Sequence, residues 1–318
     1  MKRAISAETR TGKLRISVEV VDPNTQTTVF AQSADGRGIG SALGSLDEVA
    51  SNLRESLGES LGSIHSSDKP LAQVTTPNIE ALRAFSLGSD AFHSSRVKES
   101  ITLFEQALKL DPQFAMAAVY LARARARAGD FAGAREMVAK ASASREHLTD
   151  RESLEFDAYA ARFESPANTM NKCKLWATMY PDAHAAYYCY SLAAVEDGEY
   201  ARGLSFLAPA LTQKNPQQAN AFFLKGVHLL ALNRYPEAKV AFQRAESMGL
   251  GGDKLEVAEL SAAQRNFAEA ERALSTQSAS GVTALDTRLS LDTPSFMLDQ
   301  GKWDAARDAL SNLRTQFK

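Results

Sequence analysis

The hydrophobic positions of the chain follow two different periods. Within residues 13–34 apolar and polar residues alternate, which is typical of half-buried β-strands. The alternating apolar positions are Leu14, Ile16, Val18 and Val20. The stretch Asp22–Thr25 has turn chemistry, and residues 27–33 supply a partner strand. The pattern therefore predicts a β-hairpin.

A helical period follows the hairpin in residues 45–64. Its apolar residues share one helical face and are Leu46, Val49, Leu53, Leu57, Leu61 and Ile64. Two strands and one helix bury little apolar surface by themselves. Residues 1–64 are therefore expected to be a partial α/β segment, which either docks on the helices beyond it or is the last part of a larger domain. Residues 65–77 are polar, contain two prolines and read as a linker.

From residue 78 to residue 318 the pattern is helix, short turn and helix, repeated with a period of about 34 residues. Small residues recur in the first helices, for example Gly88, Ala122 and Gly226, where they let two helices approach closely. Larger apolar residues recur in the second helices and are expected to fill the space between them: Phe104, Val138, Leu207 and Phe242. Each unit can hide its apolar face only against its neighbours, so a solenoid of about seven helix pairs is expected.

These recurring positions resemble the tetratricopeptide repeat (TPR), a helix–turn–helix unit with a Leu-Gly pair, an Ala-x3-Phe element and a late Pro. The resemblance implies a mainly α fold, a right-handed TPR α-solenoid, behind the small N-terminal hairpin and helix. Three departures stand out. Asp157 replaces a small residue, Trp176 replaces Ala, and Pro294 either breaks the first helix of the last unit or begins it.

A narrower resemblance rests on residues 145–162, 74–88 and 18–36. They are similar to the TPR arrays of bacterial signalling proteins, in which such an array follows a TolB-like domain, and most similar to peptide-modification-system cyclases. Residues 1–64 would then be a remnant of the TolB-like domain. No cyclase or kinase activity is implied, because the residues of such a catalytic domain are absent from this sequence.

Composition narrows the function classes. The formal net charge of -2 and the pI near 6.3 give no electrostatic reason to expect nucleic-acid binding. No apolar run approaches the roughly 18 residues of a membrane span. Cys173 and Cys189 are too few for a disulfide framework and are interpreted as two half-buried thiols. The chain alone is expected to be cytoplasmic, or periplasmic if it belongs to a membrane-anchored protein.

Catalytic chemistry is not indicated. The five histidines are scattered without metal-ligand spacing, and the glycine-rich stretch at residues 35–44 lacks a dinucleotide or phosphate-loop pattern. We find no nucleophile–base pair. The sequence therefore predicts a protein that is not an enzyme and that needs no cofactor or metal.

The leading functional hypothesis is a protein–protein interaction scaffold that binds peptide segments or partner helices in the concave groove of the array. The groove residues inferred by aligning the repeats are Tyr120, Arg123, Arg127, Arg162, Tyr188 and Asn220. Arginine forks suit carboxylates, so an acidic or C-terminal peptide is the expected partner. A solvated basic face paired with acids such as Glu155 is the simpler interpretation. The alternative function is a regulatory or sensory arm of a cyclase- or kinase-type signalling protein.

Overall fold

The computed structural model of the chain describes residues 2–10, 13–22, 25–56, 70, 73, 75–94, 96–212, 215, 217–250, 254–275 and 294–316. The chain divides into two compact units, residues 1–125 with 132–149 and residues 126–131 with 150–318. Most of the expected linker, residues 65–77, lies outside the described residues, so the domain limits stay a prediction. Within the part of the chain that is described, no helix is long and apolar enough to cross a membrane.

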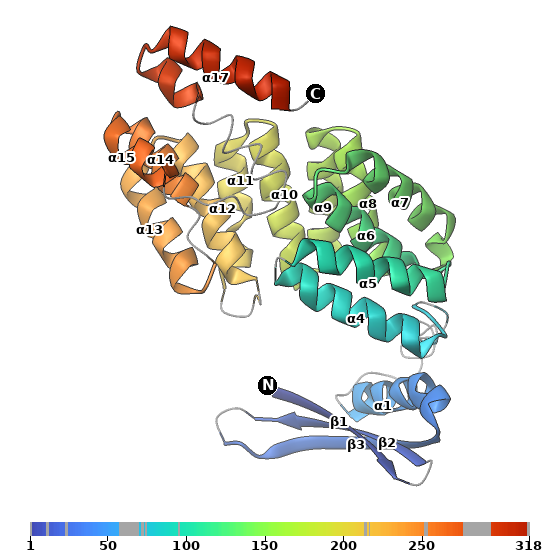
Figure 1. Cartoon of the computed structure of the whole chain (residues 1–318). Helices are drawn as coiled ribbons and strands as arrows, with labels where there is room; N and C mark the ends of the chain where they lie inside the picture. The colour runs from blue at the N-terminus through green and yellow to red at the C-terminus, as the bar shows by residue number, and fades with distance from the viewer. Residues whose placement is uncertain are drawn as a thin grey trace. The chain divides into compact units, whose positions relative to one another are not determined.

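The N-terminal segment is an antiparallel sheet of strands β1 (Lys2–Arg10), β2 (Lys13–Val21) and β3 (Thr28–Arg37), in that order (Figure 1). β2 and β3 are the predicted hairpin. β1 is an additional strand whose register pairs Ile5 with Val18 and Ala7 with Ile16. The sequence did not indicate β1 because Ile5 and Ala7 are too few to make an alternating apolar pattern visible.

Helix α1 (Ala42–Ser56) packs on this sheet after a short 3-10 turn, η1 (Ile39–Ser41). The shared apolar cluster is formed by Leu14, Ile16, Val18, Ala34, Ala42 and Val49. The predicted helix positions Leu46 and Leu53 pack against it, and so does Ile79 from the next described helix. The other predicted positions of this face, Leu57, Leu61 and Ile64, lie outside the described residues.

Helices follow in pairs in the remainder of the first unit. They are α4 (Ile79–His93), α5 (Val97–Leu110), α6 (Ala115–Arg127, whose last two residues belong to the second unit) and α7 (Phe131–Ala143). Asn78 caps α4 by accepting hydrogen bonds from the backbone N–H groups of Glu80 and Ala81. Between α5 and α6, Asp111 accepts a hydrogen bond from the N–H of Gln113, so this turn is closed by a side chain before the next helix begins.

The second unit continues the same scheme. Its helices are α8 (Asp150–Ala160), α9 (Pro166–Met179), α10 (His184–Glu196), α11 (Tyr200–Phe206), α12 (Gln218–Ala231), α13 (Tyr235–Ser247), α14 (Lys254–Ala263), α15 (Phe267–Ser275) and α17 (Trp303–Gln316). Short 3-10 turns follow α8 and α11 (η3, Ala161–Phe163; η4, Ala208–Leu211). Successive helices pack in pairs, for example α12 with α13 and α14 with α15 (Figure 1). This architecture confirms the predicted mainly α, helix–turn–helix fold class.

The predicted close approach of paired helices is confirmed at two glycines. A Cβ atom at Gly88 would lie 2.7 Å from a ring carbon of Phe104, and one at Gly226 would lie 2.4 Å from a ring carbon of Phe242. These distances are shorter than van der Waals contact, so only glycine fits without repacking. The same type of glycine–aromatic contact therefore brings α4 close to α5 and α12 close to α13.

The pair α8 and α9 departs from this scheme, as the sequence indicated. Trp176 is buried, and its indole N–H has no hydrogen-bond partner among the described residues. Cys173 of α9 and Cys189 of α10 form a disulfide, which corrects the interpretation of two separate thiols. Sequence spacing could not show this bond, because it depends on how two different helices face each other.

Candidate partner-binding surface

Helix α6 carries the first part of the candidate surface. Its Tyr120 ring has edge-to-face contacts with Phe85 and Phe92 of α4 and with Phe104 of α5, at centroid distances of 5.3, 6.1 and 5.7 Å. The guanidinium carbon of Arg123 lies 5.1 Å from the centroid of the Tyr120 ring. The aromatic cluster therefore fixes the tyrosine, and the tyrosine in turn holds the arginine by a cation–π contact.

Arg125, between the two predicted arginines of α6, has a different role. Its guanidinium lies 3.0 Å from the carboxylate of Glu105 in α5 and 3.7 Å from that of Glu136 in α7. Residues two apart on a helix do not share a face, whereas Arg123 and Arg127 are four apart and do. Arg125 therefore joins the helices of the array, and the surface bearing Arg123 and Arg127 is a separate one.

The second unit groups three more of the predicted residues. Tyr188 of α10 is half-buried, and burial raises the pKa of its hydroxyl group. The nearby positive charges of Arg162 and Arg127 lower that pKa and so oppose the effect of burial. A guanidinium N–H of Arg162 also donates a hydrogen bond of 2.7 Å to Glu196 of α10. The structure thus brings Arg127, Arg162 and Tyr188 together, with an acid that neutralises part of the charge.

The remaining predicted residue, Asn220, lies in the first turn of α12 and is half-buried. Its side-chain amide could accept and donate hydrogen bonds to a peptide backbone. Whether it belongs to the same surface as Tyr188 stays a prediction.

Sequence reasoning missed a serine–histidine pair in the second unit. The Oγ of Ser191 in α10 lies 2.6 Å from the Nε2 of His228 in α12, and the same hydroxyl donates to the carbonyl oxygen of Gly203. Both side chains are fully buried, so a substrate could not reach them in this packing. Burial lowers the pKa of the His228 imidazole to about 4, which keeps it neutral at physiological pH.

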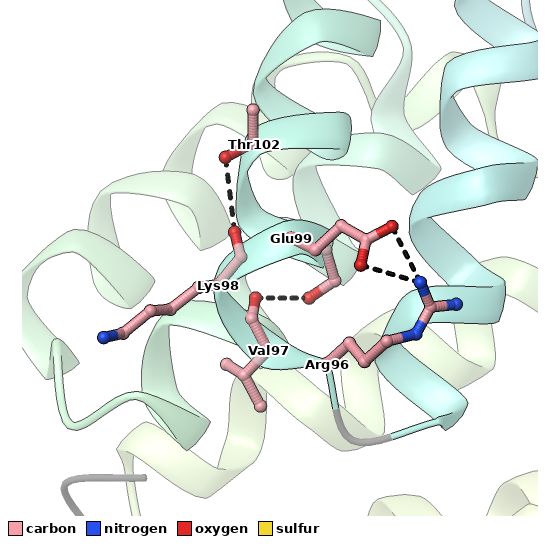
Figure 2. Close-up of polar contacts among 6 residues, drawn as sticks. Arg96, Val97, Lys98, Glu99 and Thr102 are labelled. Carbon is pink, nitrogen blue, oxygen red and sulfur yellow. Dashed lines mark hydrogen bonds and ion pairs between the residues drawn. The ribbon is translucent and has the colours of Figure 1, made fainter. Parts of the chain in front are cut away.

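The second helices carry a separate set of charges. At the start of α5 the guanidinium of Arg96 donates to both carboxylate oxygens of Glu99, at 2.7 and 2.8 Å (Figure 2). At the start of α13, Arg234 pairs with Glu237 through two nitrogens, with Nε donating to one carboxylate oxygen and Nη2 to the other. All four side chains are about half exposed, and both pairs lie at the starts of second helices.

The glycine–aromatic contacts and the paired helices define an α-helical repeat protein. Residues 85–146 and 191–249 match the family model of the tetratricopeptide repeat. Both matched segments lie within residues 78–318, where the sequence pattern predicted tetratricopeptide repeats. The intervening residues 147–190 hold the irregular pair α8 and α9.

Solved structures with similar folds share little sequence with this chain. One is PilW, a widely conserved type IV pilus biogenesis factor (17% identity, 65% of this chain and 99% of that chain, TM-score 0.45). Others are a tetratricopeptide repeat protein from Parabacteroides merdae (13%, 75% and 93%, 0.47) and a thermophilic TPR protein from Thermus thermophilus (19%, 58% and 99%, 0.45). No curated protein matches the chain.

Proposed function

We propose that the chain is a non-catalytic scaffold whose first helices bind an acidic or C-terminal peptide segment of a partner protein. The proposal rests on an arrangement that occurs twice. In each case arginine side chains lie near the tyrosine of a first helix. Arg123 accompanies Tyr120 in the first unit, and Arg127 and Arg162 accompany Tyr188 in the second. A guanidinium fork can bind a carboxylate in two-pronged fashion, and a fixed tyrosine offers an apolar face beside it.

A binding experiment with short peptides tests this function. We would screen a library of acidic peptides by fluorescence anisotropy, each made with a free C-terminal carboxylate and as its C-terminal amide. The wild-type chain should bind members of the free-acid set, with an affinity that falls as salt rises. If no acidic peptide binds at low salt, the proposed class of partner is wrong.

Two double variants separate a specific surface from net charge. Arg123→Ala/Arg127→Ala should weaken the selected peptide at least tenfold at low salt, or about 1.4 kcal/mol. Arg96→Ala/Arg234→Ala removes the same charge from the second helices and should leave the affinity nearly unchanged. A loss below about 0.5 kcal/mol in the first variant is the size of an ordinary surface effect and would exclude Arg123 and Arg127 as the binding residues.

The ion pair between Arg162 and Glu196 supplies a test in the opposite direction. A partner carboxylate must compete with Glu196 for the guanidinium of Arg162. Such an exposed pair is worth about 0–1 kcal/mol, so Glu196→Gln should strengthen the binding of the peptide by up to about fivefold. Weaker binding would show that Glu196 does not compete with the peptide for Arg162.

A second candidate is a regulatory arm of a cyclase- or kinase-type signalling protein, with residues 1–64 as the remnant of a TolB-like domain. The observation that favours it is the N-terminal sheet, which has its own apolar cluster with α1 and an additional strand. A catalytic signalling domain encoded in the same reading frame or next to it would support this candidate. Its absence from the gene's neighbourhood would count against it.

A further inference from the structure

The disulfide between Cys173 and Cys189 crosses a boundary between two helix pairs. Cys173 is in α9, the second helix of the irregular pair, and Cys189 is in α10, the first helix of the next pair. Their Cα atoms are 5.9 Å apart, within the usual range for a disulfide. Cys173 is fully buried and belongs to an apolar cluster with Met170, Trp176 and Tyr190.

This boundary also lies in the irregular part of the array. It lies in the stretch 147–190 that separates the two matched segments. Trp176 occupies a position where a small residue is expected and buries an indole N–H without a partner, which costs free energy. In a repeat array each interface between neighbours adds its own share of the stability. A covalent link between α9 and α10 adds to the share of this interface.

We infer that this cystine is a permanent structural cross-link, so that the chain matures and works in an oxidising compartment outside the cytosol. Disulfides persist in such compartments and are rare where thiols are kept reduced. The bond forms by thiol–disulfide exchange with an oxidised dithiol carrier. The two cysteine thiols lose two protons and two electrons, and the disulfide of the carrier is reduced to two thiols. Burial of Cys173 favours a stable bond over an exposed, readily exchanged one.

The direct test is the redox state of the two cysteines in the native host. Intact cells are treated with acid and N-ethylmaleimide to block free thiols, and the purified protein is digested with trypsin without reductant. Cleavage after Lys172, Lys174 and Arg202 should yield the dipeptide Cys173–Lys174 joined to the peptide 175–202. Recovery of both cysteines as maleimide adducts would overturn the inference.

A stability measurement checks the structural role of the bond. Protein refolded under oxidising conditions should unfold roughly 5–10 °C higher than protein refolded with reductant, because the bond closes a loop of moderate length. The double variant Cys173→Ala/Cys189→Ala should have the same midpoint in both conditions. If the two wild-type midpoints coincide as well, the cross-link is not structural and the inference fails. Neither readout depends on a partner, so the proposed scaffold function is tested separately.

Discussion

The buried imidazole of His228 should make the second unit sensitive to acid. The folded state holds this group neutral, with a pKa lowered from 6.5 to about 4 by burial, whereas the unfolded chain binds a proton near pH 6.5. Below pH 6.5 the unfolded state therefore binds more protons than the folded state. Stability then falls as the pH falls towards 4 and levels off below that value.

The size of the effect follows from the two pKa values. Linkage gives a loss of about 2 kcal/mol at pH 5 and about 3 kcal/mol at pH 4, relative to neutral pH. The loss should be concentrated where His228 packs, between α10, α11 and α12. Ser191 and Gly203 line that position, and a Cβ atom at Gly203 would lie 2.3 Å from the imidazole ring. The ring is fully buried, so charging it favours opening of this position to water.

Hydrogen exchange with mass spectrometry, read over residues 184–231 at several pH values, measures this local opening. The matched variant is His228→Leu, which replaces the imidazole with an apolar side chain of similar size and removes the titrating group. Acid should speed exchange more in the wild type than in this variant, and carboxylates titrate equally in both. Ser191→Ala keeps the histidine and should keep the acid sensitivity. Equal acid responses of the wild type and His228→Leu would refute the reasoning.

Three further predictions concern packing. Gly226→Ala should destabilise the α12–α13 pair by about 1–3 kcal/mol in chemical denaturation, because the new methyl group overlaps the Phe242 ring. The control is Gly44→Ala, which should be neutral or slightly stabilising because this helical glycine has open space around it. Phe104→Ala should cost about 3–5 kcal/mol, and Phe242→Ala less than that because its ring is only partly buried. Hydrogen exchange should place each loss near the altered pair, and unchanged exchange there would show that the assigned register is wrong. Residues 1–64 expressed alone should show a shallow thermal transition, since they would lack the contact with Ile79, and a sharp transition would contradict their assignment as a partial segment.

The fold was largely predictable because its main determinants are local and periodic. The spacing of Gly88 and Phe104 already implied that one packs on the other, and the structure confirms the contact. β1 was missed because its apolar residues are few, and its position depends on pairing with β2. This pairing is local, since Arg10 lies opposite Lys13, but a hairpin is recognised in a sequence mainly by alternating apolar residues, which β1 lacks.

The candidate surface was predictable only in part, because it depends on contacts between different helices. Helical geometry separates Arg125 from Arg123 and Arg127, but the acids that Arg125 joins come from two other helices. Ser191 and His228 are 37 residues apart, close to one repeat but not equal to it, so aligning the repeats does not bring them together. A repeat pattern predicts which positions face a neighbouring helix. It cannot predict which polar side chains contact each other there, because those contacts depend on how far one helix is displaced along its neighbour. In this protein, such contacts give the buried pair of Ser191 and His228 and the disulfide between Cys173 and Cys189.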